Sequence, residues 1–221
     1  MHPWMLTAPQ ATLPESATTA FQAAWDARDP ALLPPETPRW LFLRWLQEQG
    51  VLFHGSPQAG LTVFEARTPH DLSADDFSKR TGVFATSDAL WALMYALRER
   101  SRVKRMVNAA LQVQQTGSWS ETRYFLSLAP QPDLTVTGGQ ELLSTGFVYV
   151  LPPDGFERMP DYDWPGLGRV REPHLICPQP VRPLLAVPVT PADFPLPVRL
   201  HDAATVDARC AADPWGFPWL D

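Results

Sequence analysis

The chain has 221 residues, of which 45% are hydrophobic and 11% aromatic, a composition typical of one globular domain with attached terminal segments. It has no run of 18 apolar residues, and its first ten residues lack the basic and apolar regions of a secretory signal. We therefore expect no membrane span and a cytoplasmic location. Eighteen Lys and Arg against 24 Asp and Glu give a net charge of −6, which excludes a global field that attracts nucleic acid. The two cysteines exclude a disulfide framework, and His174 and Cys177 without a second ligand pair do not predict a metal site.

The first fifty residues predict two packing helices. Residues 16–28 carry apolar side chains at i, i+3 and i+4, and end before an Asp-Pro turn. A similar stripe over residues 38–49 closes with Gly50, a residue type common just past the end of a helix.

The middle of the chain predicts short strands and one long helix. Apolar runs bounded by turn residues predict strands over residues 51–54, 61–65 and 82–85. Thr86 or Ser87 is then expected to cap a helix over about 88–106, whose N-terminus would face a ligand.

The last third is rich in proline. Fourteen of the 25 prolines lie after residue 150, which excludes long helices there outside proline-free gaps. Short β-rich runs predict strands at 122–128, 147–151, 173–177 and 184–189, with a long Pro/Gly/Asp-rich loop before the third. We expect an α+β fold with a twisted sheet or two packed sheets. A short helix over 202–212 should precede Trp215, Phe217 and Trp219, docked on the core.

Three local features are candidates for chemistry, and each has a plain structural alternative. His54-Gly55-Ser56 ends an apolar strand, where a residue without a Cβ lets a ligand approach the main chain, or where a histidine simply caps a turn. Phe84 and Tyr95 lie on a strand and on the helix after it, where their rings border one cleft or fill the core. Glu172 opens a strand before Pro173, as a partly buried functional carboxylate or as half of a surface ion pair with Arg171.

In this order the three segments resemble the His-Tyr-Glu branch of the ADP-ribosyltransferase superfamily, to which the poly(ADP-ribose) polymerases belong. That branch has a His-Gly-Ser/Thr strand, a Gly-x-Tyr-Phe-Ala-like strand that runs into a helix with a second tyrosine, and a late glutamate that opens a strand. The residues after Glu172 agree in their intervals as well, with Leu175-Ile176, Pro178, Val181-Arg182 and a strand from Leu184. The resemblance covers roughly residues 50–190.

The resemblance implies an ADP-ribosyltransferase-like split β-sandwich over residues 51–197, with the helical segment 1–50 packed on it and the tail 198–221 docked on the same domain. It implies a mono-ADP-ribosyltransferase with NAD as substrate, no metal, and a protein or nucleic-acid acceptor. With water as acceptor, the same site would be an NAD glycohydrolase. Polymer synthesis is not implied, because the chain-elongation features of the polymerases are not recognisable.

Site roles follow from the same resemblance. Main-chain atoms of Gly55 would bind the carboxamide, Tyr95 would stack on nicotinamide, and His54 would hydrogen-bond the adenosine ribose with support from Ser56. Glu172 would bind the 2′-hydroxyl of the nicotinamide ribose and stabilise the oxocarbenium-like state.

The chain also departs from the family pattern. Phe84, or Val83 in a shifted register, stands where the family has its first tyrosine, so one hydroxyl is missing from the expected NAD-binding set. Ala92 replaces a family serine, which leaves carboxamide binding to Gly55 with Thr86 or Ser87.

Two rival functions and one basic segment remain open. An RNA 2′-phosphotransferase shares the His-Gly-Ser segment, but its Arg-His-x-His segment and its set of phosphate-binding arginines are not found here. A non-catalytic NAD-binding module would account for the two replaced hydroxyls. The five cations within residues 98–105 are interpreted as the solvated end of the helix, with phosphate contact as the alternative.

Overall fold

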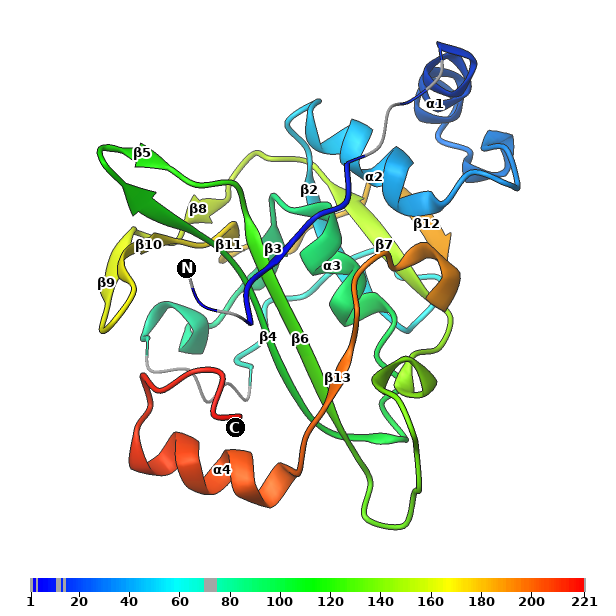
Figure 1. Cartoon of the computed structure of the whole chain (residues 1–221). Coiled ribbons are helices and arrows are strands. Elements are labelled where there is room, and N and C mark those ends of the chain that lie inside the picture. The colour runs from blue at the N-terminus through cyan, green and yellow to red at the C-terminus, as the bar shows by residue number, and fades with distance from the viewer. Residues whose placement is uncertain (1, 3, 11–12, 14, 70–74, 221) are drawn as a thin grey trace.

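The computed structural model describes residues 2, 4–10, 13, 15–69 and 75–220, which form two β-sheets and several short helices (Figure 1). The strands of the seven-stranded sheet run in the order β1 (Leu6–Thr7), β6 (Arg123–Pro130), β4 (Val103–Gln115), β10 (Gly168–Arg171) and β9 (Tyr162–Trp164). On this sheet β5 (Ser118–Trp119) pairs with β4, and β13 (Arg199–Leu200) pairs with β6.

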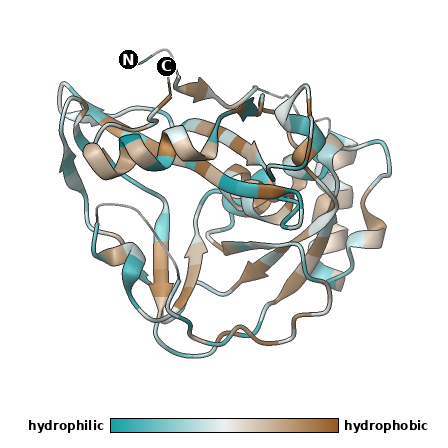
Figure 2. Ribbon diagram, turned by 90° about the horizontal axis from the view of Figure 1, so that it is seen from below, coloured by the Kyte–Doolittle hydropathy of each residue, from teal (hydrophilic) through white to brown (hydrophobic). Residues whose placement is uncertain are grey.

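The second sheet has six strands, in the order β12 (Leu185–Val189), β7 (Gly146–Leu151), β2 (Leu52–Ser56), β3 (Val83–Thr86), β11 (His174–Cys177) and β8 (Glu157–Arg158). Neighbouring strands in both sheets are antiparallel, apart from the parallel pair of β13 with β6. Hydrophobic residues lie along the strands of both sheets and on the helices (Figure 2). The two antiparallel sheets and the helices confirm the α+β class predicted from the sequence.

Both N-terminal helices form where the apolar stripes predict them. They are α1 (Glu15–Ala27) and α2 (Arg39–Gln47), and Gly50 follows α2 with a φ of 76°. The rings of Phe21 and Phe42 pack edge to face at 5.4 Å between centroids, inside the largest hydrophobic cluster. Short 3-10 turns lie at Pro30–Leu32, Phe77–Lys79, Gly139–Leu142 and Pro191–Asp193.

The predicted helix over 88–106 is wrong in its second half. Helix α3 spans Ala89–Ala96 only, and a turn at residues 97–102 leads into β4, the longest strand. Residues 107, 109, 111 and 113 of β4 are buried on one alternating face, and a register shift between residues 103 and 105 separates Val103 from this face. The predicted cap is also wrong, because the N-cap is Asp88, whose carboxylate accepts the backbone N–H of Trp91.

Two further segments differ from the prediction. Residues 61–65 form no extended strand, since their one bridge joins Phe64 to Val181. The long loop before residue 173 contains β8, β9 and β10, and the last two form an antiparallel hairpin. This hairpin ends directly before Glu172.

The C-terminal segment packs on the seven-stranded sheet. Helix α4 (Ala203–Ala212) contributes the buried Val206, and the chain after it brings Phe217 and Trp219 against a cluster that includes Phe125 and Val170. Trp215 packs against the rings of Tyr162 and Trp164. Phe217 lies 5.3 Å from Phe125 and 5.1 Å from Trp4 between ring centroids. The two ends of the chain therefore meet on the same face of this sheet.

Candidate functional site

A cleft of about 440 Å³ opens where β2 and β3 separate. Strand β2 pairs with β7 along residues 52–56, whereas its pairing with β3 is limited to Phe53 opposite Thr86. The walls come from β2, β3, α3 and the loop after β2. Of the predicted site residues, His54, Gly55, Ser56, Phe84, Thr86 and Tyr95 line this cleft.

His54 connects the two separated strands. Its Nδ1 lies 2.7 Å from the carbonyl oxygen of Phe84, and because a carbonyl only accepts, Nδ1 carries the proton and Nε2 is left as an acceptor in the neutral ring. Burial is the main cause that lowers the pKa of His54 below 6.5, the nearby positive charge of Arg100 acts the same way, and the bond to Phe84 opposes them. The ring is therefore neutral at pH 7.

We expect an NMR titration to give His54 a pKa below 6.5. In the unfolded chain the His54 ring is protonated near pH 6.5, whereas in the folded protein it is protonated only at lower pH. The contribution of the neutral ring to the free energy of unfolding is therefore complete above pH 6.5, and it is lost as the pH falls from 6.5 toward the folded-state pKa. Urea unfolding at several pH values should detect this loss, and His54→Gln should remove it. A His54 pKa at or above 6.5 would contradict a partly buried, neutral ring.

Gly55 and Ser56 have structural roles at the end of β2. A Cβ built on Gly55 would lie 1.9 Å from the carbonyl oxygen of Ala92, so this residue lets α3 pack directly on β2. The hydroxyl of Ser56 accepts the backbone N–H of Gln58 and fixes the turn after the strand.

Aromatic rings form much of the cleft wall. Phe84 lies on β3, and Tyr95, which is 40% exposed, lies on α3 with its ring 6.2 Å from that of Trp91. His174 of β11 packs against Phe84 and Trp91, at 5.1 and 5.3 Å. Such a wall suits a flat ring, which stacks on aromatic faces.

The start of α3 is fixed by a buried polar network. The Thr86 hydroxyl accepts the backbone N–H of Asp88, and the carboxylate of Asp88 accepts both the Trp91 N–H and the hydroxyl of Tyr124, the latter at 2.6 Å. Burial raises the pKa of Asp88 against these hydrogen bonds. The Asp88 carboxylate therefore caps α3, and the network sets the position of α3 beside β2.

Ser87 and Glu172 lie next to the cleft but do not line it. The Ser87 backbone N–H donates to the carbonyl oxygen of Pro173, 3.0 Å away, which ties the end of β3 to the residue after Glu172. The carboxylate of Glu172 accepts a hydrogen bond from Tyr162. Arg171 pairs with Asp161 and not with Glu172, so the ion pair considered for the neighbouring residues is not formed.

Several residues that line the cleft were missed by the sequence analysis. Glu65 is the acidic residue among the described lining residues, and Arg67 and Arg100 are the basic ones. Trp91 and His174 complete the aromatic wall. Regular spacing offered no signal for the three charged residues, because Glu65 and Arg67 belong to an irregular loop and Arg100 to a turn.

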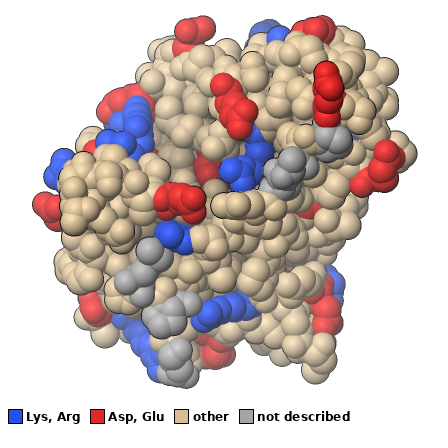
Figure 3. Space-filling model, turned by 45° about the horizontal axis from the view of Figure 1, so that its top comes forward, with Lys and Arg blue, Asp and Glu red and all other residues tan. Residues whose placement is uncertain are grey.

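The basic run does not form the end of a helix. It occupies the turn after α3 and the first residues of β4, where Arg102 donates to the carbonyl oxygen of Glu141 and Arg105 pairs with Asp207 at 2.9 Å. On the face drawn in Figure 3, positive and negative side chains are interspersed.

Among the described residues, no cluster of three or more His, Cys, Asp or Glu side chains is suited to hold a metal ion. Within the same part of the chain, no helix has the length and apolar character needed to cross a membrane. Comparison with protein-family models, curated proteins and solved structures finds no match to this chain.

Proposed function

We propose that the chain is an NAD-dependent mono-ADP-ribosyltransferase with an ADP-ribosyltransferase-like split β-sandwich. The observation that carries the proposal is that His54 and Gly55 of β2, Phe84 of β3 and Tyr95 of α3 line one cleft. These residues were selected from local features of the sequence, and the same segments carry the resemblance to that family. A cleft of about 440 Å³ with a largely aromatic wall falls within the size range of small-molecule sites.

The geometry supports a division of roles in the cleft. Tyr95 is 40% exposed on α3 and would stack on nicotinamide, and the Nε2 atom of His54 would accept a hydrogen bond from a ribose hydroxyl. Close packing of α3 over Gly55 brings the tyrosine-bearing helix beside the His-Gly-Ser strand. Thr86 and Ser87 flank the start of this helix.

Glu172 is proposed as the carboxylate that binds the 2′-hydroxyl of the nicotinamide ribose. It lies two residues before His174, which lines the cleft, and side chains two apart in an extended chain share one face. Pro173 favours extended backbone at Glu172. A fixed carboxylate there would stabilise positive charge on the ribose as the glycosidic bond to nicotinamide breaks.

The function is tested by incubating the protein with nicotinamide-labelled NAD and measuring released nicotinamide by chromatography. We expect release, and mass spectrometry of an added cell extract should find ADP-ribose on a protein or nucleic-acid acceptor. Release without a modified acceptor would instead indicate an NAD glycohydrolase.

A non-catalytic NAD-binding module is the second candidate, favoured by the aromatic Phe84 and the methyl group of Ala92 in the cleft wall, where the family has hydroxyls. Calorimetry with NAD distinguishes it, because a module binds NAD and releases no nicotinamide. Absence of binding would contradict both candidates.

A further inference from the structure

Glu172 lies where the chain passes from one sheet to the other. Strand β10 of the seven-stranded sheet ends at Arg171, and β11 of the six-stranded sheet begins at His174. Only Glu172 and Pro173 connect them. A side chain at such a crossing takes its position from both sheets.

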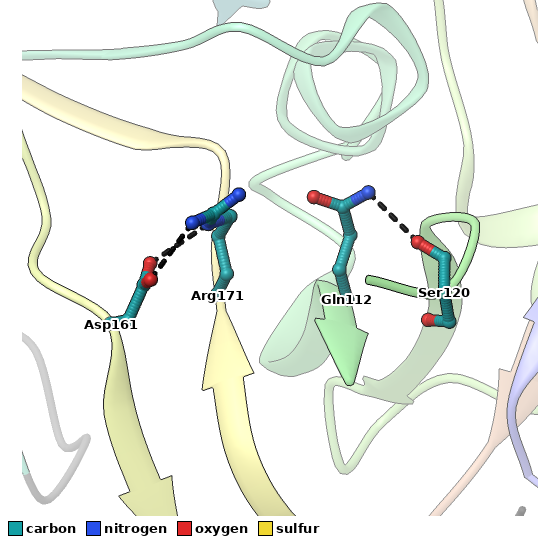
Figure 4. A network of polar contacts seen from close by, with 4 residues as sticks. All are labelled: Gln112, Ser120, Asp161 and Arg171. Atoms are coloured by element: carbon teal, nitrogen blue, oxygen red, sulfur yellow. Dashed lines mark hydrogen bonds and ion pairs between the residues drawn. The ribbon is translucent and has the colours of Figure 1, made fainter. Parts of the chain in front are cut away.

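The backbone before Glu172 is firmly held. The guanidinium of Arg171 forms two hydrogen bonds of 2.9 Å to the carboxylate of Asp161 (Figure 4). It also lies 4.0 Å from the ring centroid of Trp119. Arg171 is paired with Gln112 of β4, whose side chain in turn donates to the backbone oxygen of Ser120. With the Ser87 contact to Pro173, both neighbours of Glu172 are fixed.

The carboxylate itself is held by Tyr162 of β9. The Tyr162 hydroxyl donates to Oε1 of Glu172 at 2.5 Å, a short hydrogen bond. Burial and the charge of Glu172 raise the pKa of Tyr162, so the hydroxyl stays protonated as a donor at neutral pH.

The Tyr162 ring is supported in turn by the C-terminal segment. It stacks at 6.1 Å on Trp164 and packs at 6.0 Å against Trp215. The indole N–H of Trp164 donates to the backbone oxygen of Trp215 at 3.0 Å, and Phe217 packs on Trp164. Residues 215–217 therefore cover the hairpin that carries Tyr162.

We propose that Tyr162, supported by Trp164 and Trp215, is a positioning residue that holds the carboxylate of Glu172 for NAD cleavage; this inference rests on the function proposed above. A carboxylate held by a preorganised donor need not be reoriented as charge develops on the ribose. The aromatic C-terminal segment thus belongs to the support of the site as well as to the core.

The test compares Tyr162→Phe with the wild type in nicotinamide release. Loss of a hydrogen bond to a charged group predicts a kcat about tenfold to a hundredfold lower, with a KM within about threefold of the wild type. Affinity for a carbocyclic NAD analogue, which the protein cannot cleave, should stay unchanged. A purely structural role would lower stability and affinity together, and leave kcat per folded molecule intact.

Coupling to Glu172 supplies a second readout. In a Glu172→Gln background, Tyr162→Phe should cost almost nothing further, because Tyr162 acts through that carboxylate. Tyr149→Phe is the matched control: it also removes a hydrogen-bonded tyrosine hydroxyl, but this one bonds Gln58 and Leu61, so its effect should add to that of Glu172→Gln.

The outcomes separate the two proposals. If the wild type releases no nicotinamide, the proposed function fails. If the wild type is active, Glu172→Gln is inactive and Tyr162→Phe keeps the wild-type kcat, only the positioning role is overturned. All variants are assayed below their thermal midpoints. Should Tyr162→Phe not fold, Trp164→Phe breaks the bond to Trp215 and should lower kcat in the same way, and an unchanged kcat would again overturn the role.

Discussion

Replacing Glu172 by glutamine is expected to lower nicotinamide release by about 10²- to 10³-fold. Glutamine keeps the size of the side chain and an oxygen that accepts the Tyr162 hydrogen bond, but removes the negative charge. If the carboxylate stabilises the oxocarbenium-like ribose, the loss falls on kcat. Affinity for the carbocyclic NAD analogue should change by only a few fold.

Glu65→Gln is the matched control, since Glu65 is the acidic residue among the described lining residues of the cleft. We expect this variant to keep activity within about tenfold of the wild type, the scale of one exposed polar contact. The opposite result, an active Glu172→Gln and an inactive Glu65→Gln, would assign the catalytic carboxylate to the loop after β2. Nicotinamide release under single-turnover conditions gives the rate of the chemical step for both variants.

Gly55→Ala is expected to destabilise the fold by about 3 kcal/mol, because the added Cβ would overlap the carbonyl oxygen of Ala92 and crowd the backbone nitrogen of Ala96, 2.6 Å away. For a chain of this size, that loss lowers the thermal midpoint by about 6–12 °C. Helix α3 must move off β2 to relieve the overlap, and Tyr95 moves with it. Differential scanning calorimetry measures the shift, and NAD calorimetry the loss of affinity.

Gly138→Ala controls for the effect of replacing any glycine. Its φ of −149° and ψ of 151° suit alanine, and the nearest atom to an added Cβ lies 3.8 Å away. This variant should therefore unfold within about 2 °C of the wild type. A Gly55→Ala midpoint equal to that of Gly138→Ala would contradict direct packing of α3 on β2.

Much of the local structure could be predicted from neighbouring residues. Helices α1 and α2 show clear 3.6-residue stripes, and the strands at β2, β3, β6, β7, β11 and β12 are short apolar runs between turn residues. Each of these patterns lies within about a dozen consecutive residues, so it can be recognised without knowledge of the rest of the chain. The six lining residues among the predicted site set were found in the same way, from two short segments and one helix.

The helix predicted to reach residue 106 is wrong in its second half for a reason that is not local. Leu90, Leu93, Met94 and Leu97 satisfy a helical period, but residues 98–102 turn, and the alternation of buried residues from Val107 to Val113 is that of a strand. Pairing of β4 with β6 over much of its length, from Val103 to Leu111, decides between them. That pairing depends on a partner that follows later in the chain.

The sequence by itself determined the α+β class, the two N-terminal helices and the three segments that carry the candidate site. Only the tertiary structure decided that β9 and β10 form a hairpin before Glu172, that Tyr162 bonds its carboxylate, and that Trp215 covers the hairpin. Periodicity records which face of an element is buried, whereas hydrogen bonds such as that of Tyr162 depend on how separate elements pack. The chain from residue 162 to Glu172 must turn back on itself, and Trp215 must return from the C-terminal segment, before these groups meet.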